Sequence, residues 1–364
     1  MLKFQQKLIE RKKMGSERSL SLFIGFSDFF SNDYLGLGAA TEFQNVNPSG
    51  GGGSRLISGN SVEAENTEKM IAEFFISEDA LIFNSGYDAN IGFFSSVPQR
   101  GDFILYDELI HASIRDGIRL SNAKAFSFKH NDTTDLKQKL ERIEGTVFVA
   151  IESLYSMDGD IAPLKEIAEI CQNTNALLIV DEAHACGIFG EQGKGICHQN
   201  GNLDQIFARI ITFGKAYGTH GAAVLGSSEL KNFLVNFARS FIYTTALPPY
   251  QYDHIQKQIT KSIDDDNRLK LNQNIRFFRS LVSNKVSLSD ENSPIQIILI
   301  PGIENAQNLA QVIQNEKIAV KAILSPTVPE GQERLRICLH AFNTEEEIEK
   351  LCKLILQHQS LISI

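Results

Sequence analysis

The stretch "ALLIVDEAH" (176–184) joins an apolar run directly to a carboxylate and an imidazole. The run is apolar on both faces, which is typical of a buried strand in a parallel sheet. The earlier run "VFVAIES" (147–153) has the same character, and the helical pattern "APLKEIAEICQNTN" (162–175) separates the two. Pro163 suits the first turn of that helix. The order strand, helix, strand predicts a mainly parallel sheet wrapped by helices.

Two further apolar runs continue this pattern toward the C-terminus. They are "ARIITFGKA" (208–216) and "AAVLGSS" (222–228), and we expect both to be strands of the same sheet. The middle of the chain is therefore predicted to form an α/β domain.

The C-terminal part of the chain predicts a smaller α+β domain. Its strand and helix patterns are "PIQIILIPG" (294–302), "NAQNLAQVIQNE" (305–316), "ERLRICLHA" (333–341) and "NTEEEIEKLCKLILQHQ" (343–359). In the last of these, Thr344 and Glu347 have the spacing of a capping box. One long helix across 250–284 is expected to join this domain to the large one.

These patterns predict three parts of the chain. An N-terminal helix and arm occupy 1–45, a large domain 46–250, and a small α+β domain with its linking helix 251–364. The start, "MLKFQQKLIERKK" (1–13), has the spacing of a short amphipathic helix and lacks the apolar segment and cleavage site of a signal peptide.

The composition narrows the class of protein. The chain has 364 residues, 43% of them hydrophobic, and a net charge of -9. No dense Lys/Arg stripe is present and no apolar run is long enough to span a bilayer. The five cysteines include no C-x-x-C pair, which favours reduced thiols over a disulfide frame or a zinc site. We therefore expect a cytoplasmic protein without nucleic-acid, membrane or metal partners.

The letters D-E-A-H at 181–184 also occur in nucleic-acid-dependent ATPases. That function requires a phosphate-binding loop of the form G-x-x-x-x-G-K-[ST], and the sequence contains none. The segment "GEQGKG" (190–195) comes nearest but has neither the spacing nor the hydroxyl. A DEAH-type nucleotide hydrolase therefore stays a disfavoured alternative.

Lys215 lies in "ITFGKAYGTHGAAVLG" (211–226), in a glycine-rich turn after a predicted strand. Desolvation lowers the pKa of an amine and makes it nucleophilic toward carbonyls. Pyridoxal phosphate (PLP) needs such a lysine and an acid for its pyridinium nitrogen. Asp181 ends the preceding strand, where open α/β sheets bind ligands. A helix-capping aspartate and a turn lysine are the alternative, but the ordered pair on successive strands favours the cofactor.

The segment "PSGGGGSRLISGN" (48–60) contains a run of four glycines. Composition alone favours a flexible linker. Arg55 and the apolar Leu56 and Ile57 that follow also suit an ordered turn where the backbone passes close to another group, but from composition the linker is preferred.

Several motifs in order resemble the α-oxoamine synthases, PLP enzymes of the aspartate-aminotransferase fold (PLP fold type I). The resemblance covers about 28–350, nearly the whole chain. The motifs that carry it are "SNDYLGLG" (31–38), "GGGGSRLISGN" (50–60), "FNSGYDANIGF" (83–93), "DELIHASIRDG" (107–117), "ESLYSMDGDIAPL" (152–164), "DEAHACGIFG" (181–190), "TFGKAYGTHGAAVLG" (212–226), "FIYTTALPP" (241–249) and "SPTVPEGQERLR" (325–336). The resemblance implies a large domain around a mainly parallel sheet and a smaller C-terminal α+β domain.

The resemblance assigns the catalytic roles position by position. Lys215 matches the lysine that holds PLP, and Asp181 matches the carboxylate on the pyridinium nitrogen. His184 matches the residue bonded to the phenolic oxygen, and His111 matches the imidazole stacked on the ring. Asp181 and His184 are three residues apart, so both can face one flat ligand only if the chain turns between them.

Further cofactor contacts follow from the same resemblance. Gly86 and Tyr87 match the backbone amides that bind the phosphate at a helix N-terminus. Ser153 and Thr212 match hydroxyl contacts to the cofactor.

Thr244 and Thr245 match residues that reach the phosphate from the neighbouring subunit. The resemblance therefore implies a homodimer with shared active sites. It also gives the glycine run a better explanation than a linker, because the corresponding family segment approaches the active site near the dimer interface.

On the substrate side, Asn32, Thr327 and Arg336 match residues that contact the amino acid. A guanidinium offers a planar, two-pronged grip on a carboxylate. Arg334 lies two residues away on the same predicted strand face, so the choice of Arg336 comes from the family. Arg18, in the N-terminal arm, is a candidate for contact with the acyl tail.

The chain departs from the family pattern at three positions. The family usually has a histidine near positions 61 and 64, and this chain has Ser61 and Ala64 there. Leu324 occupies a position where the family has an arginine. These changes leave the cofactor residues intact and bear on recognition of the acyl substrate.

The family joins an amino acid to an acyl thioester with loss of carbon dioxide. The segments 212–225 and 237–249 are most similar to the branch that uses L-alanine and a pimeloyl thioester, carried by coenzyme A or a carrier protein, in biotin synthesis. The glycine-using branch and a catalytically silent protein of the same fold stay as alternatives. In the family mechanism, Lys215 removes the Cα proton as general base.

Overall fold

The computed structural model describes residues 3–17, 22–38, 49–282 and 286–362. The chain divides into two compact units. The large unit consists of Leu35–Tyr155 and Ile161–Asp265, and the small unit of Met1–Tyr34, Ser156–Asp160 and Asp266–Ile364.

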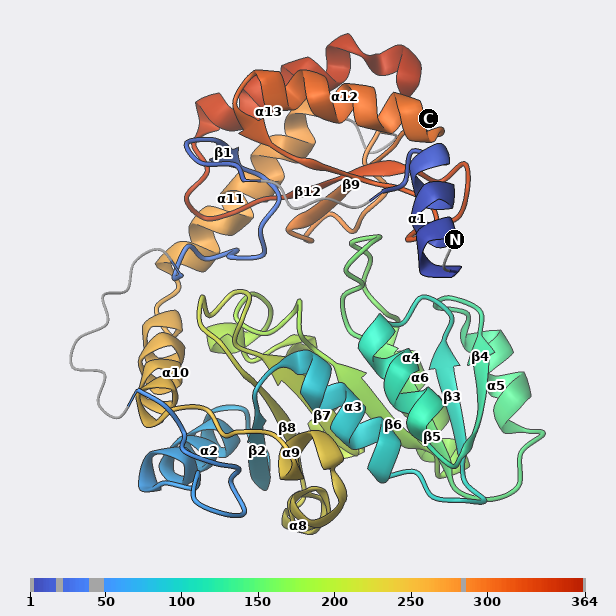
Figure 1. Ribbon diagram of the computed structural model, residues 1–364, viewed down its shortest axis with the longest axis vertical. Helices are drawn as coiled ribbons and strands as arrows, with labels where there is room; N and C mark the ends of the chain where they lie inside the picture. The colour runs from blue at the N-terminus through green and yellow to red at the C-terminus, as the bar shows by residue number, and fades with distance from the viewer. Residues whose placement is uncertain (1–2, 18–21, 39–48, 283–285, 363–364) are drawn as a thin grey trace. The chain divides into compact units, whose positions relative to one another are not determined.

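A seven-stranded sheet forms the centre of the large unit (Figure 1). Its strands, in the order in which they lie side by side, are β2 (Asp79–Phe83), β8 (Ala222–Gly226), β7 (Ala208–Thr212), β6 (Leu177–Asp181), β5 (Val147–Glu152), β3 (Phe103–Asp107) and β4 (Lys124–Phe128). Only β8 pairs antiparallel to its neighbours. The expected mainly parallel sheet is therefore confirmed, and all four runs predicted as its strands belong to it.

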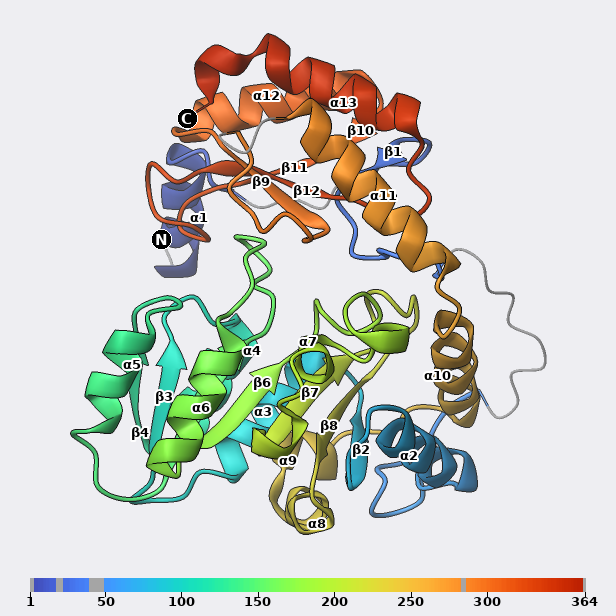
Figure 2. The ribbon, with the colours of Figure 1, turned by 180° about the vertical axis from the view of Figure 1, so that it is seen from behind.

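Helices cover both faces of this sheet (Figures 1 and 2). One face packs against α3 (Gly86–Ser96), α4 (Ala112–Leu120), α8 (Ser228–Phe237) and α9 (Arg239–Ile242). The other face packs against α2 (Val62–Phe74), α5 (Thr133–Leu140), α6 (Leu164–Thr174), α7 (Ile196–Gln199) and α10 (Pro249–Ser262). Successive side chains of a strand point to opposite faces of the sheet. Because helices cover both faces, the side chains on both faces must be apolar, and all six residues of β5 are indeed buried.

Side chains at the helix starts explain where several of these helices begin. Ser85, His111, Asp132 and Ser227 each accept a hydrogen bond from a backbone N–H in the first turn of α3, α4, α5 and α8. We expected Pro163 in the first turn of α6. Pro163 is instead the N-cap of α6, so this prediction is wrong by one position.

The small unit contains a three-stranded antiparallel sheet in the order β11 (Lys321–Ile323), β12 (Arg334–Cys338), β9 (Ile295–Leu299). A short parallel pair joins β1 (Ser27–Asp28) to β10 (Ile318–Ala319). The helices of this unit are α1 (Lys3–Lys13), α11 (Asp266–Leu281), α12 (Ile303–Asn315) and α13 (Glu345–Gln357). Figures 1 and 2 show α12 and α13 along one side of the sheet. The capping box of Thr344 and Glu347 at α13 is confirmed.

Three single turns of 3-10 helix complete the elements of the described residues: Glu191–Gly193 and Leu203–Gln205 in the large unit, and Gln359–Leu361 in the small unit. No helix in the described ranges is both long enough and apolar enough to span a bilayer.

The single long helix expected across 250–284 is wrong. The chain forms α10 and α11 instead, and the break falls at 263–265, next to the division between the two units. Asp264, Asp265 and Asp266 follow one another here, and acidic side chains favour the first turn of a helix over its last turn. By its contacts, α10 belongs to the large unit, whereas the sequence placed it in the small domain.

The glycine run is an ordered turn and not a flexible linker. Ala246 N–H donates to the Gly53 carbonyl at 2.9 Å, and Gly59 N–H donates to the Ser54 carbonyl at 2.9 Å. A Cβ at Gly59 would lie 2.2 Å from the Gly53 carbonyl oxygen, and one at Gly51 would lie 2.4 Å from that of Ala246. Glycine is needed here because backbone passes directly against backbone.

This packing predicts different effects of alanine at two glycines of the ordered turn. Gly59→Ala should lower the free energy of unfolding by about 1–3 kcal/mol, because its methyl group meets a backbone oxygen. Gly50→Ala is the matched control, since a Cβ there has nothing within 4 Å, and should change it by less than about 0.5 kcal/mol. Urea denaturation measures both; equal effects would contradict the ordered turn.

Candidate active site

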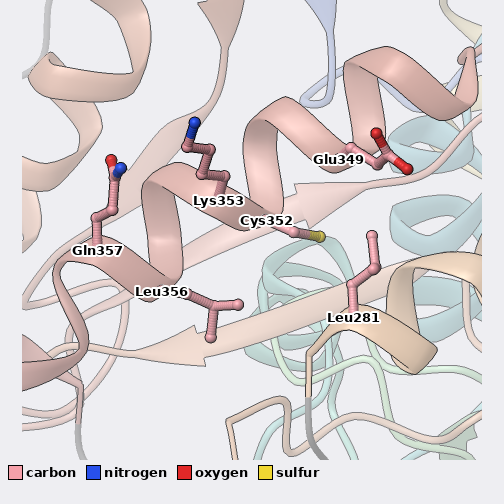
Figure 3. A pocket seen from close by; sticks show the side chains of 6 residues that line it. All are labelled: Leu281, Glu349, Cys352, Lys353, Leu356 and Gln357. Carbon is pink, nitrogen blue, oxygen red and sulfur yellow. The ribbon is translucent and has the colours of Figure 1, made fainter.

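Two cavities differ in the chemistry of their walls. One, of about 500 Å³, lies in the small unit and is lined by Leu281, Glu349, Cys352, Lys353, Leu356 and Gln357. Figure 3 shows that all but Leu281 come from α13, and that Lys353 and Gln357 point away from Leu281. Its lining residues give apolar surface with the charges of Glu349 and Lys353 at the margin, and no histidine is among them.

The other cavity, of about 190 Å³, lies in the large unit. It is lined by Gly86, Tyr87, Asn90, His111, Ser113, Glu152, Asp181, Ala183, His184, Thr212 and Lys215. An amine, two carboxylates and two imidazoles therefore face one small space, and we take it as the candidate active site.

The sheet positions these groups at one edge. Glu152, Asp181 and Thr212 are the last residues of β5, β6 and β7, three neighbouring parallel strands. The carboxyl ends of parallel strands meet at the same edge of a sheet, which is where open α/β folds bind ligands.

Lys215 lies in the turn between β7 and β8. The Thr219 N–H donates to the Phe213 carbonyl at 2.9 Å and the Gly218 N–H to the Lys215 carbonyl at 2.8 Å, which hold this turn closed. The Lys215 Nζ lies 2.8 Å from Nε2 of His184. The two residues therefore form a hydrogen-bonded pair of an amine and an imidazole inside the cavity.

Asp181 is 5% exposed, and both of its carboxylate oxygens accept hydrogen bonds. Oδ1 accepts from the Ala183 N–H at 2.9 Å, and Oδ2 accepts from Nδ2 of Asn90 at 2.8 Å. The chain leaves the strand after Asp181 and turns through 183–188. This turn brings His184 into the same cavity, as the three-residue spacing required.

His111 caps the N-terminus of α4 and lines the cavity. Its Nδ1 accepts a hydrogen bond from the Ser113 N–H at 3.2 Å and lies 2.7 Å from the Ser113 hydroxyl oxygen. Burial lowers the pKa of His111, and the nearby Lys215 lowers it further, whereas Asp181 opposes the shift. The net effect favours the neutral imidazole.

Gly86 and Tyr87 open α3, and Ser85 is its N-cap. The N–H groups of a first helical turn have no intrahelical partner, and the helix dipole favours an anion there. A Cβ at Gly86 would lie 3.7 Å from that of Thr212, so the helix start lies directly beside the end of β7. The hydroxyl of Tyr87 bonds to Asp116 and leaves the backbone to face the cavity.

Three residues predicted to contact the cofactor do not line this cavity. Ser153 is fully buried, with its hydroxyl 3.4 Å from the Asp181 carbonyl oxygen, and Glu152 takes the lining position beside it. Thr244 Oγ1 and the Thr245 carbonyl both accept from Nδ2 of Asn84, at 3.1 and 2.9 Å.

The predicted substrate residues belong to the small unit. Arg336 is 8% exposed and donates to the Ser156 carbonyl at 2.6 Å, Oδ1 of Asn32 at 2.9 Å and Sγ of Cys338 at 3.0 Å. These partners are neutral, whereas Arg334 donates to the carboxylate of Asp158 at 2.5 Å. The structure thus separates the two arginines: Arg334 is neutralised, and Arg336 keeps its charge.

The remaining predicted positions are placed as follows. Thr327 is exposed, and its N–H donates to the Leu324 carbonyl at 2.9 Å. Arg18 lies outside the described residues.

Ser61 caps α2 by accepting a hydrogen bond from the N–H of Ala64, and Ala64 is completely buried. A histidine side chain would not fit at position 64 without displacing the core around it.

Sequence reasoning missed Asn90, Ser113, Glu152 and Ala183. Glu152 could have been found, because it is the one charged residue that ends a strand of six buried residues. Asn90 lies one turn after Gly86 on α3, but its partner Asp181 is 91 residues away, and no local pattern signals that contact.

The electrostatic state of Glu152 is set by its surroundings. Burial raises the pKa of this carboxyl well above its ordinary value of 4.5, and the negative charge of Asp181 raises it further. The folded protein therefore holds a proton on Glu152 that the unfolded chain releases near its ordinary pKa.

This proton predicts how stability depends on pH. Above pH 4.5 the folded state binds more protons at Glu152 than the unfolded state does. The contribution of Glu152 to the free energy of unfolding therefore falls by up to about 1.4 kcal/mol per pH unit. Glu152→Gln has no such proton. Its stability relative to the parent chain should therefore rise between pH 5 and 8, with the exposed Glu141→Gln as control. A difference that does not change with pH would contradict a protonated Glu152.

Comparisons with known proteins agree with this geometry. Residues 26–355 match the aminotransferase class I and II family. The 8-amino-7-oxononanoate synthase of Emericella nidulans is 42% identical over 371 residues, covering 90% of this chain and 88% of that protein.

Solved structures show the same fold. The 8-amino-7-oxononanoate synthase of Francisella tularensis has a TM-score of 0.78 and 33% identity, covering 92% of this chain and 98% of that one. A structure of SPT with PLP has a TM-score of 0.90 and 26% identity, covering 98% of each chain. The resemblance to the α-oxoamine synthases is confirmed, and the chain belongs to the aminotransferase class I and II family.

Proposed function

We propose that this chain is a PLP-dependent acyltransferase that joins L-alanine to a pimeloyl thioester. The products are 8-amino-7-oxononanoate, carbon dioxide and the free thiol, and the reaction belongs to biotin biosynthesis. The observation that carries the proposal is the Lys215–His184 pair, 2.8 Å apart, in one cavity with the buried Asp181. The similarity to 8-amino-7-oxononanoate synthases over most of the chain supports the choice of reaction.

The residues of the cavity fit PLP. The cofactor carries an aldehyde, a phenolic oxygen, a ring nitrogen and a phosphate, and the cavity offers one suitable group for each. These are the Lys215 amine, the His184 imidazole, the Asp181 carboxylate and the N-terminus of α3. The hydrogen-bond partners described for Asp181 are neutral N–H groups, so its charge is available for a cationic ring nitrogen.

When bound, PLP supplies an electron-withdrawing ring that stabilises negative charge at the amino-acid Cα. The protein's part is to hold and move protons. Asp181 would hold the protonated ring nitrogen with its negative charge, and the Lys215 amine would serve as the base for the Cα proton. His184 is hydrogen-bonded to that amine and orients it. Thr212 and the first-turn amides of Gly86 and Tyr87 bind the phosphate end.

Arg336 binds the carboxylate of the amino acid, with Asn32 and Thr327 as further substrate contacts. Its guanidinium is held by neutral partners and keeps its charge, which suits a planar carboxylate ligand. Arg334 is excluded from this role by its ion pair with Asp158.

The acyl substrate is a thioester of coenzyme A or of a carrier protein. Arg18 is the proposed contact for its tail, by the family resemblance. The departures at Ser61, Ala64 and Leu324 lie away from the amine, imidazole and carboxylate that handle the cofactor, and they bear on the acyl chain.

The protein acts as a homodimer, and Thr244 and Thr245 reach the phosphate of the partner's site. Leu56, Ile57 and Tyr243 are 51%, 87% and 72% exposed in the single chain. The Gly53–Ala246 hydrogen bond places their segments side by side. Such a group of exposed apolar side chains is typical of an interface between subunits. The five cysteines are buried and form no disulfide with one another, which favours a reducing compartment, and we place the protein in the cytoplasm.

The substrate assignment predicts a clear order of rates. L-alanine with a pimeloyl thioester should give a higher kcat/KM than glycine with an acetyl thioester, by about tenfold or more, because one buried methyl contributes about 1 kcal/mol or more. Thiol release, followed with a thiol reagent, measures both reactions. Faster turnover of glycine would assign the chain to the glycine-using branch of the family.

The role of Lys215 predicts loss of both the bound chromophore and turnover in Lys215→Ala. The variant should bind PLP only reversibly and condense no substrate, because it lacks the amine that forms the covalent bond and moves the proton. Lys137→Ala, at an exposed position of α5, is the control. Absorbance after dialysis reports the cofactor. Retained turnover in Lys215→Ala would end the proposal, as would ATP hydrolysis without a chromophore.

A further inference from the structure

A continuous line of hydrogen bonds joins Asp181 to His111 through two residues that no part of the proposed reaction uses. Asn90 Nδ2 donates to Oδ2 of Asp181 at 2.8 Å and to the Ser113 hydroxyl oxygen at 3.0 Å. The Ser113 oxygen lies 2.7 Å from Nδ1 of His111. Asn90 is 2% exposed and Ser113 0%, so water does not compete for these bonds.

The orientation of the Asn90 amide follows from its neighbour. The Asp181 carboxylate only accepts hydrogen bonds, so the atom of Asn90 that faces it must be the nitrogen. The same nitrogen also reaches Ser113, and Oδ1 of Asn90 has no hydrogen-bond partner among the described residues. The hydroxyl of Ser113 therefore accepts from Asn90, and its own proton is directed toward His111.

The tautomer of His111 follows from two donors at one atom. The backbone N–H of Ser113 can only donate, and it points at Nδ1 of His111 at 3.2 Å. The Ser113 hydroxyl proton is directed to the same atom. Nδ1 must therefore carry a lone pair, and the ring proton of the neutral imidazole lies on Nε2.

We propose that Asn90 and Ser113 are positioning residues that hold His111 as the neutral Nε2–H tautomer and couple it to Asp181. Protonation of Nδ1 would place an N–H against the backbone N–H of Ser113 and would force the Ser113 hydroxyl to turn its own proton away. The coupling to Asp181 is one of position: the carboxylate fixes the Asn90 amide, and the same amide nitrogen holds the Ser113 hydroxyl in place.

The charged groups around His111 act on its pKa in opposite directions, and burial decides the net shift. Lys215 disfavours an imidazolium, Asp181 and Asp116 favour it, and burial outweighs them, so the pKa of His111 lies below its ordinary value. Glu152, which also lines the cavity, accepts from the backbone N–H of His111 and has its own pKa raised by burial. A neutral His111 can lie against a cationic ring without repelling it.

The inference rests on the proposed function for its consequence, since His111 serves the ring of PLP. Its structural part is tested without catalysis, on 15N-histidine-labelled protein with and without PLP. A His111→Gln spectrum assigns the resonance among the eight histidines of the chain. At pH 8 the His111 signals should show an unprotonated Nδ1 and a protonated Nε2 in both forms. A protonated Nδ1 in either form overturns the proposal.

Variants test the positioning role separately from folding. Ser113→Ala removes the hydroxyl and should lower kcat by about 3- to 10-fold with KM for L-alanine within about twofold. It should also make the His111 signals a mixture of tautomers. Ser113→Thr keeps the hydroxyl and should restore the single tautomer and most of kcat. Ser121→Ala, at the end of the same helix, is the control.

Asn90→Leu removes the middle of the line and should leave His111 uncoupled from Asp181. PLP should then change the His111 nitrogen shifts less than it does in the parent protein, because only direct contact with the ring is left. An unchanged tautomer in Ser113→Ala, or a PLP-dependent shift in Asn90→Leu equal to that of the parent, overturns the proposal. If PLP fails to bind the parent protein, the proposed function fails, while the tautomer measured without PLP still decides the structural part.

Discussion

The fixed position of the Asp181 carboxylate is the constraint on which the rest of the site depends. A buried carboxylate at the edge of a parallel sheet needs donors, and it has two: the Ala183 N–H and the amide of Asn90. The first requires the chain to turn sharply after β6, and the same turn brings His184 to Lys215. The second ties the strand to α3, whose N-terminus is the anion-binding end of the cavity.

The neighbouring Glu182 explains the D-E-A-H sequence without an ATPase. Adjacent residues at a strand end point to opposite sides, and Glu182 is fully buried, accepting from the Cys197 N–H at 2.9 Å and lying 3.6 Å from Arg209. A Cβ at Gly195 would lie 2.6 Å from its carboxylate oxygens, so "GEQGKG" is a turn folded against Glu182 and not a phosphate loop. In this motif, Asp181 and His184 serve the cavity and Glu182 holds the loop behind it.

The sequence predicted what depends on local pattern or on motifs. Apolar runs placed β5, β6, β7 and β8, and the ordered motifs placed Lys215, Asp181, His184 and His111 in one cavity. It failed where distant residues decide. The break between α10 and α11 and the ordered glycine turn depend on packing against other segments. The Asn90–Ser113 line joins three elements, and Glu152 lines the cavity where its neighbour Ser153 does not, because successive side chains at a strand end point to opposite sides.

The most direct measurement of the central claim is to locate the bound cofactor on the chain. PLP added to the purified protein is fixed by borohydride reduction, and peptide mass spectrometry identifies the residue that carries it. The account predicts a single modified peptide containing Lys215, because that amine lies beside His184 in a cavity with Asp181. Attachment to a different lysine, or no attachment at all, would contradict it.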